Sequence, residues 1–470
     1  MGSARAARHL VCTVVSIALV CSTSAAAGAQ TLLGPPVTVA GPIPVRVTPG
    51  DPSNDFVFSM SGMNLAEHGY IEQEFFVEGI ANRYTRPEME TAEVVDEAHP
   101  YKTRFIVRRP AAAADFNGTV VVEWNNVTAG RDLDIDWLQV GEHLMRNGYA
   151  WIGLSAQRVG VDQMREWSPA RYGTLDVTVG GTIEGDALSY DILTAVGRLF
   201  RGSGGRALLG GADVERVFAT GHSQSAGRLA VYLNNIHPLD PVFDGVIVHG
   251  GGGRIRDDQP VKIWKLMAET DMVRRVGNRQ PDSDNFRQWE VAGSSHVDVF
   301  YGQERAKAIA ASEGLDPSEG RMRDLVCDRP VYSRVPFRHV MHTAFDQMVE
   351  WVVEGTAPST APSIAAAPTA TSMVFARDAR GNVLGGIRLA AHAVPTAKNT
   401  GINTGQGFCR LYGSHEPFDA ATLAALYPTH AAYVAAVRAA VMANVEAGYL
   451  LEYDAKTTIE EAEASHIGRR

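Results

Sequence analysis

Short apolar runs alternate with amphipathic stretches along most of the chain. Residues 119–124 form a near-continuous apolar run, as expected for a strand that is buried on both faces of a sheet. Residues 136–147 and 186–200 instead repeat apolar side chains at helical spacing. The same reasoning predicts further strands at 66–80, 101–108, 149–154, 214–220, 245–249, 261–267 and 288–292, and further helices at 339–353 and 429–447. This alternation is typical of an α/β fold with a doubly wound, mostly parallel sheet.

Long stretches without a clear pattern interrupt the predicted main domain, which we place at residues 30–355. The longest are residues 155–185, 272–286 and 297–337. Loops of this length within a compact domain are usually lids or binding loops. We therefore expect cap or lid insertions near 155–185 and 297–337.

The C-terminal part begins after a change in composition. Residues 356–372 are rich in Ala, Pro, Thr and Ser, which favours a linker or a surface strap. Residues 373–470 then contain a hairpin pattern around Arg380-Gly381-Asn382 and one apolar helical stripe. This segment has too few apolar elements to fold alone, so we expect a C-terminal extension that packs on the main domain.

The first residues have the pattern of an export signal. Arg5 and Arg8 precede an apolar stretch at 10–20, and Ala27-Gly28-Ala29 offers a cleavage site between small residues. The apolar stretch is short for a stable membrane span. We therefore predict that residues 1–29 are a cleaved signal peptide and that the protein is secreted or periplasmic.

Charge and cysteine content narrow the class of protein. The chain carries a formal net charge of −10, which argues against a nucleic-acid partner, and it gives no indication of oligomeric state. Cleavage of the signal removes two of the four cysteines and leaves Cys327 and Cys409. Two cysteines in an exported protein favour one disulfide between them, with two buried free thiols as the alternative.

The segment from Val217 to Gly227 carries the clearest chemical pattern. An apolar strand ends at Gly221, Ser223 follows, and a helical pattern begins directly afterwards. Strand, tight turn and helix in this order are the context of a nucleophile elbow, which exposes one serine hydroxyl above the sheet. Small residues are needed two positions before and after the nucleophile. Gly221 fills the first place, and Ser225 fills the second, where glycine is usual.

A serine nucleophile needs a base, and the base needs an orienting acid. His296 follows the strand at 288–292, and Asp271 follows the strand at 261–267, with Glu269 as an alternative acid. The chain order Ser223, Asp271, His296 is the one found with nucleophile elbows. His339 and His342 on the predicted closing helix are the competing bases.

An oxyanion hole requires backbone N–H donors near the nucleophile. We expect one from Gln224 and the other from Asn125-Asn126-Val127, after strand 119–124, although the amides of Asn125 and Asn126 could instead orient that loop. His249 starts a run of four glycines, which we interpret as a turn near the floor of the site, because an oxyanion loop belongs before the nucleophile. The expected lining residues of the substrate pocket are His222, Trp167, Tyr172 and Tyr301, the last three with burial in the cap core as the alternative.

Together, these motifs resemble the α/β-hydrolase superfamily over residues 66–355. The residues that carry the resemblance are Gly221-His222-Ser223-Gln224-Ser225, Glu269-Thr270-Asp271 and Gly293-Ser294-Ser295-His296. The chain also resembles large exported α/β-hydrolase-domain proteins of serine carboxylesterase type, at Glu123-Trp124-Asn125-Asn126 and Gly385-Gly386-Ile387-Arg388-Leu389. The resemblance implies an α/β-hydrolase fold and a Ser-His-acid mechanism without a cofactor.

The resulting hypothesis is an exported serine hydrolase that cleaves carboxylic esters, of small molecules or polymers, through an acyl-enzyme. An amidase or peptidase with the same triad is one alternative, and a non-catalytic binding protein on this scaffold is another. No metal-binding pattern such as His-Glu-x-x-His is present in the sequence, so we expect no metal.

Overall fold

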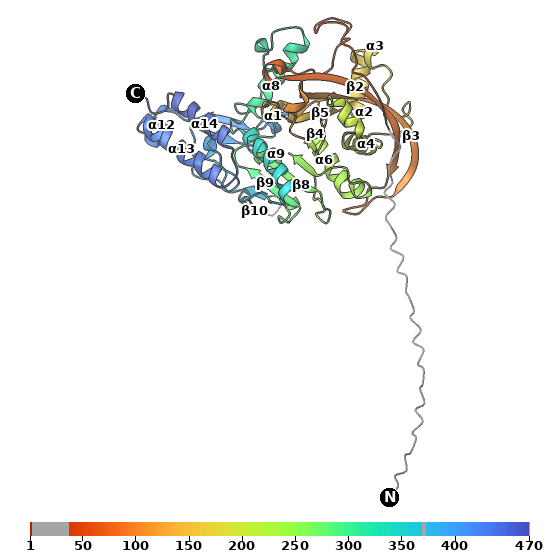
Figure 1. Ribbon diagram of the computed structural model, residues 1–470. Helices are drawn as coiled ribbons and strands as arrows, with labels where there is room; N and C mark the ends of the chain where they lie inside the picture. Colours follow the sequence, from red (N-terminus) through yellow and green to blue (C-terminus); the bar gives the residue numbers. More distant parts are fainter. Residues whose placement is uncertain (2–36, 369–372, 470) are drawn as a thin grey trace. The chain divides into compact units, whose positions relative to one another are not determined.

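A nine-stranded β-sheet forms the centre of the molecule (Figure 1). This computed structural model describes Met1 and residues 37–368 and 373–469, so the expected signal peptide, apart from Met1, lies outside the described residues. In spatial order the strands are β1 (Thr38–Ala40), β2 (Tyr70–Tyr84), β3 (Val94–Pro110), β5 (Ala150–Leu154), β4 (Thr119–Trp124), β6 (Arg216–His222), β7 (Gly245–His249), β8 (Lys262–Ala268) and β9 (Phe286–Val291). The strands from β5 to β9 are parallel, and β1, β2 and β3 are antiparallel to their neighbours.

Helices cover both faces of the sheet, because the central strands are apolar on both sides. In β4, Val120 and Val122 point into one core and Val121 into the other. The first core contains residues of α2 (Arg158–Trp167), α3 (Pro169–Tyr172), α4 (Ser189–Arg201) and α6 (Gln224–Val231). The second contains residues of α1 (Ile135–Arg146), α8 (Val299–Ser312) and α9 (Phe337–Glu354). The predicted doubly wound α/β fold is confirmed.

The β2–β3 strand pair is longer, and the two long insertions are more ordered, than the sequence indicates. Strands β2 and β3 form a long antiparallel pair that runs from Tyr70 opposite Pro110 to Ala81 opposite His99. The sequence predicts strands at 66–80 and 101–108, but charged side chains, several of them buried in pairs, conceal the full length of this pair. The insertion at 155–185 contains α2 and α3, and the insertion at 297–337 contains the 14-residue helix α8.

A buried ionic network explains this hidden part of the sheet. Glu74 of β2 lies between two arginines, with Arg104 Nη1 at 2.7 Å and Arg171 Nη2 at 2.6 Å from its carboxylate oxygens. All three side chains are almost completely buried. The network fastens α3 to the β2–β3 pair, and buried charges of this kind are tolerated because they are paired and hydrogen-bonded.

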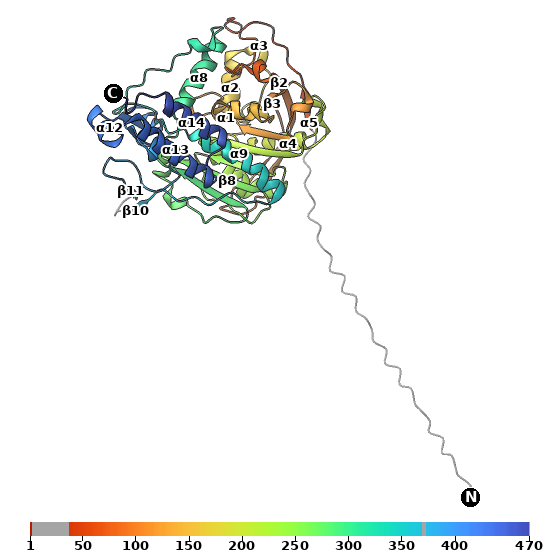
Figure 2. The same cartoon turned by 60° about the vertical axis from the view of Figure 1, so that its left-hand side comes forward.

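The C-terminal extension packs on the second core. Its main helices are α13 (His430–Glu446) and α14 (Glu452–Ala464), which lie side by side near α9 (Figure 2). Val437 of α13 and Ile459 of α14 join the same core as Phe337 of α9. The other elements are β10 (Ala366–Pro368), β11 (Met373–Phe375), α10 (Ala390–Ala393), β12 (Ala397–Thr400), α11 (Cys409–Tyr412), β13 (Ser414–Pro417) and α12 (Ala420–Leu426). The sequence predicts only one of these helices.

The segment before this extension contacts the edge of the sheet. Arg287 Nε donates to Pro358 O at 2.8 Å, and Trp289 Nε1 donates to Ser359 O at 2.9 Å. The expected turn around Arg380-Gly381-Asn382 is present, with Arg377 paired to Val383. Ile387 then pairs in parallel with Val291, so the extension continues the sheet beyond β9.

Membrane-spanning potential is limited to one bent pair of helices. Over the described ranges, no single helix is both long and apolar enough to cross a membrane. The pair α12 and α13 meets the length and composition criteria together but is bent by 68°.

A buried histidine predicts acid sensitivity of the folded state. His237 is fully buried, and burial lowers its pKa to about 4 from the usual 6.5. The unfolded chain therefore binds a proton that the folded protein excludes at this site. The contribution of His237 to stability is complete above about pH 6.5 and falls by about 3 kcal/mol as the pH drops to about 4. Urea unfolding at several pH values measures this loss. His237→Gln should reduce the dependence of the unfolding free energy on pH, whereas the control His68→Gln, at an exposed site, should not. An equal pH dependence in both variants would contradict the role given to His237.

Candidate active site

The carboxyl ends of four parallel strands, β6 to β9, meet at one edge of the sheet. In the register, His222 of β6 lies beside His249 of β7, and Ala268 of β8 lies beside Val291 of β9. The residues directly beyond these strands therefore gather at the same edge, where sites of open α/β sheets are built. Ser223, Asp271 and His296 all follow the strand ends there.

The structure brings these three side chains into one hydrogen-bonded chain. The Ser223 hydroxyl lies 2.8 Å from His296 Nε2, and His296 Nδ1 lies 2.5 Å from Asp271 Oδ1. Because a carboxylate only accepts hydrogen bonds, His296 carries its proton on Nδ1 and leaves Nε2 free to accept from the serine. Ser223 itself has φ 62° and ψ −108°, a strained conformation typical of a nucleophile elbow.

Close packing at the elbow explains the small residues around Ser223. A Cβ on Gly221 would lie 3.1 Å from Ser225 Cβ, so the strand and the helix leave no space for a side chain there. Ser225 replaces the usual glycine and makes a hydrogen bond that glycine cannot make. Its hydroxyl donates to Asn125 O at 3.1 Å and so ties α6 to the loop after β4.

Asp271 is the carboxylate that contacts His296, and the alternative Glu269 is engaged elsewhere. Asp271 Oδ2 also accepts the Ala268 N–H at 2.7 Å, which fixes the carboxylate towards His296. Glu269 pairs with Arg377 of the C-terminal extension at 2.5 Å and accepts the Gly293 N–H. Burial raises the pKa of Glu269, and Arg377 opposes the shift. Glu269 therefore fastens the extension to the sheet.

The competing bases His339 and His342 lie on α9, away from this chain of hydrogen bonds. His342 Nδ1 is 3.0 Å from Asp454 of α14. Burial lowers the pKa of His339 to about 3 and also lowers the pKa of His342. These histidines join α9 to the C-terminal extension and do not approach Ser223.

Of the four residues expected to form an oxyanion hole, two have a backbone N–H group without an acceptor in the described part of the chain. The Asn125 N–H donates to Leu154 O, and the Asn126 N–H donates to Leu133 O. Among the described residues, the N–H groups of Val127 and Gln224 have no acceptor. Of the three loop residues expected to supply an N–H donor to the oxyanion hole, only Val127 therefore remains a candidate.

Side-chain amides hold this loop against the elbow. Asn126 Nδ2 donates to His222 O at 2.9 Å, and Gln157 Nε2 donates to Asn125 O at 3.0 Å. The amide of Gln157 also hydrogen-bonds the amide of Gln224. The sequence gives no local indication of Gln157, because its role arises only when the start of the first insertion folds back over the elbow.

Three histidine rings lie in contact beneath the nucleophile. The ring of His222 is 4.2 Å from that of His296 and 4.3 Å from that of His249, centre to centre. His249 Nδ1 lies 2.7 Å from Asp136 of α1. Burial, followed by the charges of His296 and His249, holds the pKa of His222 well below 6.5, so this ring is neutral beside His296.

A pocket opens directly at Ser223. Two of the expected lining residues, His222 and Tyr301, lie in its wall. The other lining residues are Asn126, Thr128, Ala129, Leu133, Ile135, Ser223, His296, Val297, Arg305, Phe408, Leu411 and Tyr412. The pocket is therefore mainly apolar, with polar atoms near the serine.

The remaining two expected lining residues are elsewhere. Tyr172 is fully buried, and its hydroxyl donates to Glu74 at 2.8 Å in the ionic network of β2. Trp167 packs edge-on against Phe56 at a ring separation of 5.0 Å. Both belong to the core of the cap, which was the alternative interpretation, and the expectation that they line the pocket is corrected.

Comparison with known families agrees with this geometry. A family model described as an alpha/beta hydrolase domain matches residues 39–460, which is most of the chain. The chain belongs to this α/β-hydrolase family. The match includes most of the C-terminal extension, whose residues contribute to the pocket of this α/β-hydrolase. No curated protein matches the chain.

Solved structures with similarity to this α/β-hydrolase are distant. One is a serine hydrolase without a lid from Xanthomonas campestris, at 13% identity and a TM-score of 0.27, covering 50% of this chain and 93% of that chain. Another is a serine hydrolase homologue from Coxiella burnetii, at 13% identity and a TM-score of 0.26, covering 47% and 92%. A carboxylesterase from Lactobacillus plantarum has 10% identity and a TM-score of 0.25, covering 41% and 72%. We draw no conclusion from similarities this distant.

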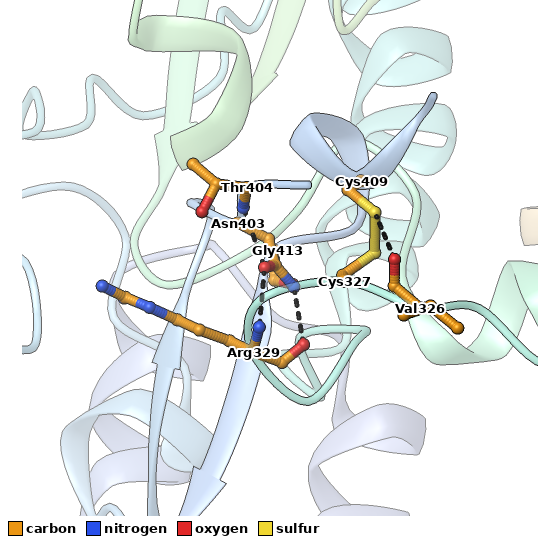
Figure 3. Close-up of a disulfide and its surroundings, with 7 residues drawn as sticks. All are labelled: Val326, Cys327, Arg329, Asn403, Thr404, Cys409 and Gly413. Carbon is orange, nitrogen blue, oxygen red and sulfur yellow. Dashed lines mark hydrogen bonds between the residues drawn. A yellow bond between two sulfur atoms is a disulfide. The ribbon is translucent and has the colours of Figure 1, made fainter. Parts of the chain in front are cut away.

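A disulfide positions the part of the pocket wall that comes from the C-terminal extension. Cys327 and Cys409 are joined, as the sequence predicts (Figure 3). Around them, Asn403 Nδ2 donates to Arg329 O at 3.1 Å and to Gly413 O at 2.8 Å. Cys409 begins the short helix α11, whose Leu411 and Tyr412 line the pocket of this α/β-hydrolase. The disulfide therefore fixes the part of the pocket wall that α11 supplies.

Metal ligation is not indicated at this site of the α/β-hydrolase. Across the residues that the structure describes, no group of three or more His, Cys, Asp or Glu side chains has the arrangement needed to hold a metal ion. The side chains at Ser223 fit nucleophilic chemistry, with a base and two free N–H donors.

Gly250→Ala is expected to impair catalysis much more than folding. Gly250 has φ +65°, and a Cβ there would lie 3.0 Å from His222 Nε2 and 3.2 Å from His296 Nδ1. The added methyl group would displace the His296 ring. A displacement of this kind lowers kcat by roughly tenfold to a hundredfold. Gly253→Ala in the same turn is the control, because a Cβ there meets nothing within 4 Å. Steady-state ester hydrolysis compares the two; equal rates would contradict a tight fit beneath His296.

Proposed function

We propose that this protein is an exported serine hydrolase that cleaves carboxylic esters through an acyl-enzyme. The observation that carries the proposal is the hydrogen-bonded chain from Ser223 through His296 to Asp271 at a strained elbow. The export pattern of residues 1–29 and the disulfide support the extracellular or periplasmic location, because disulfides persist in oxidising compartments.

In the proposed acylation step, His296 Nε2 takes the hydroxyl proton as Ser223 Oγ attacks the ester carbonyl. The carbonyl oxygen becomes an oxyanion that accepts hydrogen bonds from the N–H groups of Gln224 and Val127. Asp271 stabilises the imidazolium that forms and keeps its proton on Nδ1. The imidazolium then gives its proton to the leaving alcohol, and the acyl group remains on Ser223.

Deacylation repeats the same steps with water as the nucleophile. His296 takes a proton from water, which attacks the acyl carbonyl, and the same two N–H groups hold the second oxyanion. Collapse of this intermediate releases the carboxylic acid and returns the proton to Ser223. The apolar pocket walls, including Leu133 and Leu411, would hold the organic part of the ester.

The test is hydrolysis of p-nitrophenyl esters across acyl lengths by the wild type and by Ser223→Ala. We expect turnover by the wild type and a loss of at least about a thousandfold in the variant. Matched p-nitroanilides, measured alongside, decide between ester and amide chemistry. Ester turnover that survives the substitution would place the nucleophile elsewhere, and faster anilide turnover would favour an amidase.

A further inference from the structure

Three arginines line the Ser223 pocket or the cavities next to it, although the chain as a whole carries a net charge of −10. Arg305 of α8 lines the pocket itself. Arg131 and Arg323 line the two cavities that adjoin it, and Arg305 lines both of those as well. We call Arg131, Arg305 and Arg323 the arginine cluster. A negatively charged substrate would explain why an acidic protein concentrates positive charge around its proposed reaction centre.

The arginine cluster lacks acidic partners in the described part of the chain. None of its three members is within ion-pair distance of a carboxylate there. Nearby acids are engaged with other bases. Asp132 forms an ion pair with Arg104. Asp134 pairs with Arg108 at 2.7 Å, and Glu304 pairs with Lys307 at 2.6 Å. Asp324 lines the outer cavity together with Arg323 but forms no ion pair with it. The positive charge at the pocket is therefore uncompensated.

Burial and mutual repulsion make this arrangement costly without an anion. Arg131 is half-buried, and its pKa is lowered first by burial and then by the charges of Arg305 and Arg323. Arg305 and Arg323 therefore lie close enough for their charges to act on Arg131. Partly buried cations without partners are unfavourable, and a bound anion would relieve both the repulsion and the desolvation.

We propose that the Ser223 pocket selects esters that carry a carboxylate, which binds to Arg305 with the support of Arg131. The inference rests on the proposed ester hydrolysis and names its substrate class. The guanidinium group binds a planar carboxylate through two parallel N–H donors. The apolar side chains that line the pocket together with Arg305 and Ser223, such as Leu133 and Val297, fit the short carbon chain between that carboxylate and the scissile ester.

Matched pairs of esters test this selectivity and locate the carboxylate. For the acyl side, mono-p-nitrophenyl glutarate is compared with p-nitrophenyl pentanoate, which has the same chain length. For the alcohol side, the pentanoyl ester of 4-hydroxybutanoate is compared with butyl pentanoate, by titration of the released acid. The wild type should prefer the anionic ester of at least one pair by about tenfold in kcat/KM, the size expected of one charge-assisted hydrogen bond. Raising the salt concentration from about 0.05 M to about 0.5 M should reduce the preference.

Variants assign the preference to Arg305. Arg305→Gln should bring the ratio of kcat/KM values for the anionic and the neutral ester close to one, and Arg305→Lys should retain part of the preference. Arg86→Gln is the control for net charge, because Arg86 is exposed in the loop between β2 and β3 and lies outside the pocket lining. The proposal is overturned if the wild type prefers the neutral ester in both pairs, or if Arg305→Gln keeps the full preference.

A binding measurement separates failure of this inference from failure of the proposed function. If neither ester of a pair is hydrolysed, ester hydrolysis is wrong, but the carboxylate site can still be tested with glutarate. Calorimetric titration of glutarate into Ser223→Ala should show binding that Arg305→Gln in the same background abolishes. Absence of binding in Ser223→Ala, or binding that persists after loss of Arg305, would overturn the carboxylate site itself.

Discussion

Asp271→Asn is expected to lower kcat for a neutral ester by about ten-thousandfold while the protein stays folded. The Asp271 carboxylate accepts the Nδ1 proton of His296 at 2.5 Å. An amide can instead donate to Nδ1, which moves the imidazole proton to Nε2. In that tautomer, Nε2 cannot accept the proton of Ser223, so the nucleophile is not activated. The measurement is steady-state hydrolysis of a p-nitrophenyl ester, with circular dichroism to confirm the fold.

Glu269→Gln is the matched control for this prediction. Glu269 lies two residues earlier on the same short helix, but its carboxylate faces Arg377 at 2.5 Å. The control should therefore lower the unfolding midpoint, because Arg377 loses its partner, and keep most of kcat well below that midpoint. If Glu269→Gln instead lost as much kcat as Asp271→Asn, the assignment of the acid would be wrong.

Replacing both cysteines, in Cys327→Ser/Cys409→Ser, is expected to cost roughly 4 kcal/mol of unfolding free energy. The two cysteines are 82 residues apart in sequence, so the bond removes a large loop entropy from the unfolded chain. The variant should also lose kcat/KM, because Phe408, Leu411 and Tyr412 form a pocket wall next to Cys409. Urea unfolding and ester hydrolysis measure the two effects.

Reduction of the wild type provides the control for the disulfide. A reductant should make the wild type resemble the double variant and should leave the double variant unchanged. If the double variant keeps the wild-type stability, or if reductant lowers its activity as much as that of the wild type, the effect does not arise from this bond.

The reaction centre could be predicted from sequence because its cues are local. Ser223 lies between an apolar strand and a helical pattern, and Asp271 and His296 follow apolar strands in the usual chain order. Parallel strands then bring such residues to one edge without further information. The structure places Ser223 and Asp271 each within hydrogen-bond distance of His296, in agreement with that expectation.

The parts that sequence reasoning missed depend on contacts between distant segments. Tyr172 has the character of a pocket residue, but the buried charge of Glu74 draws its hydroxyl into the core. The sequence does not predict helix α8, because its apolar and polar residues are not segregated to separate faces. This helix supplies Arg305 to the pocket. Gln157 acquires its place only when the first insertion folds against the loop after β4.

The most direct test of the central claim is labelling with a fluorophosphonate, followed by peptide mass spectrometry of the folded protein. Such a reagent reacts with a serine only when a base and an oxyanion hole activate it. We predict one covalent adduct, on Ser223, that is absent after heat denaturation and absent from His296→Ala. An unlabelled protein, or an adduct on another residue, would contradict the assignment of Ser223 as the nucleophile of this α/β-hydrolase.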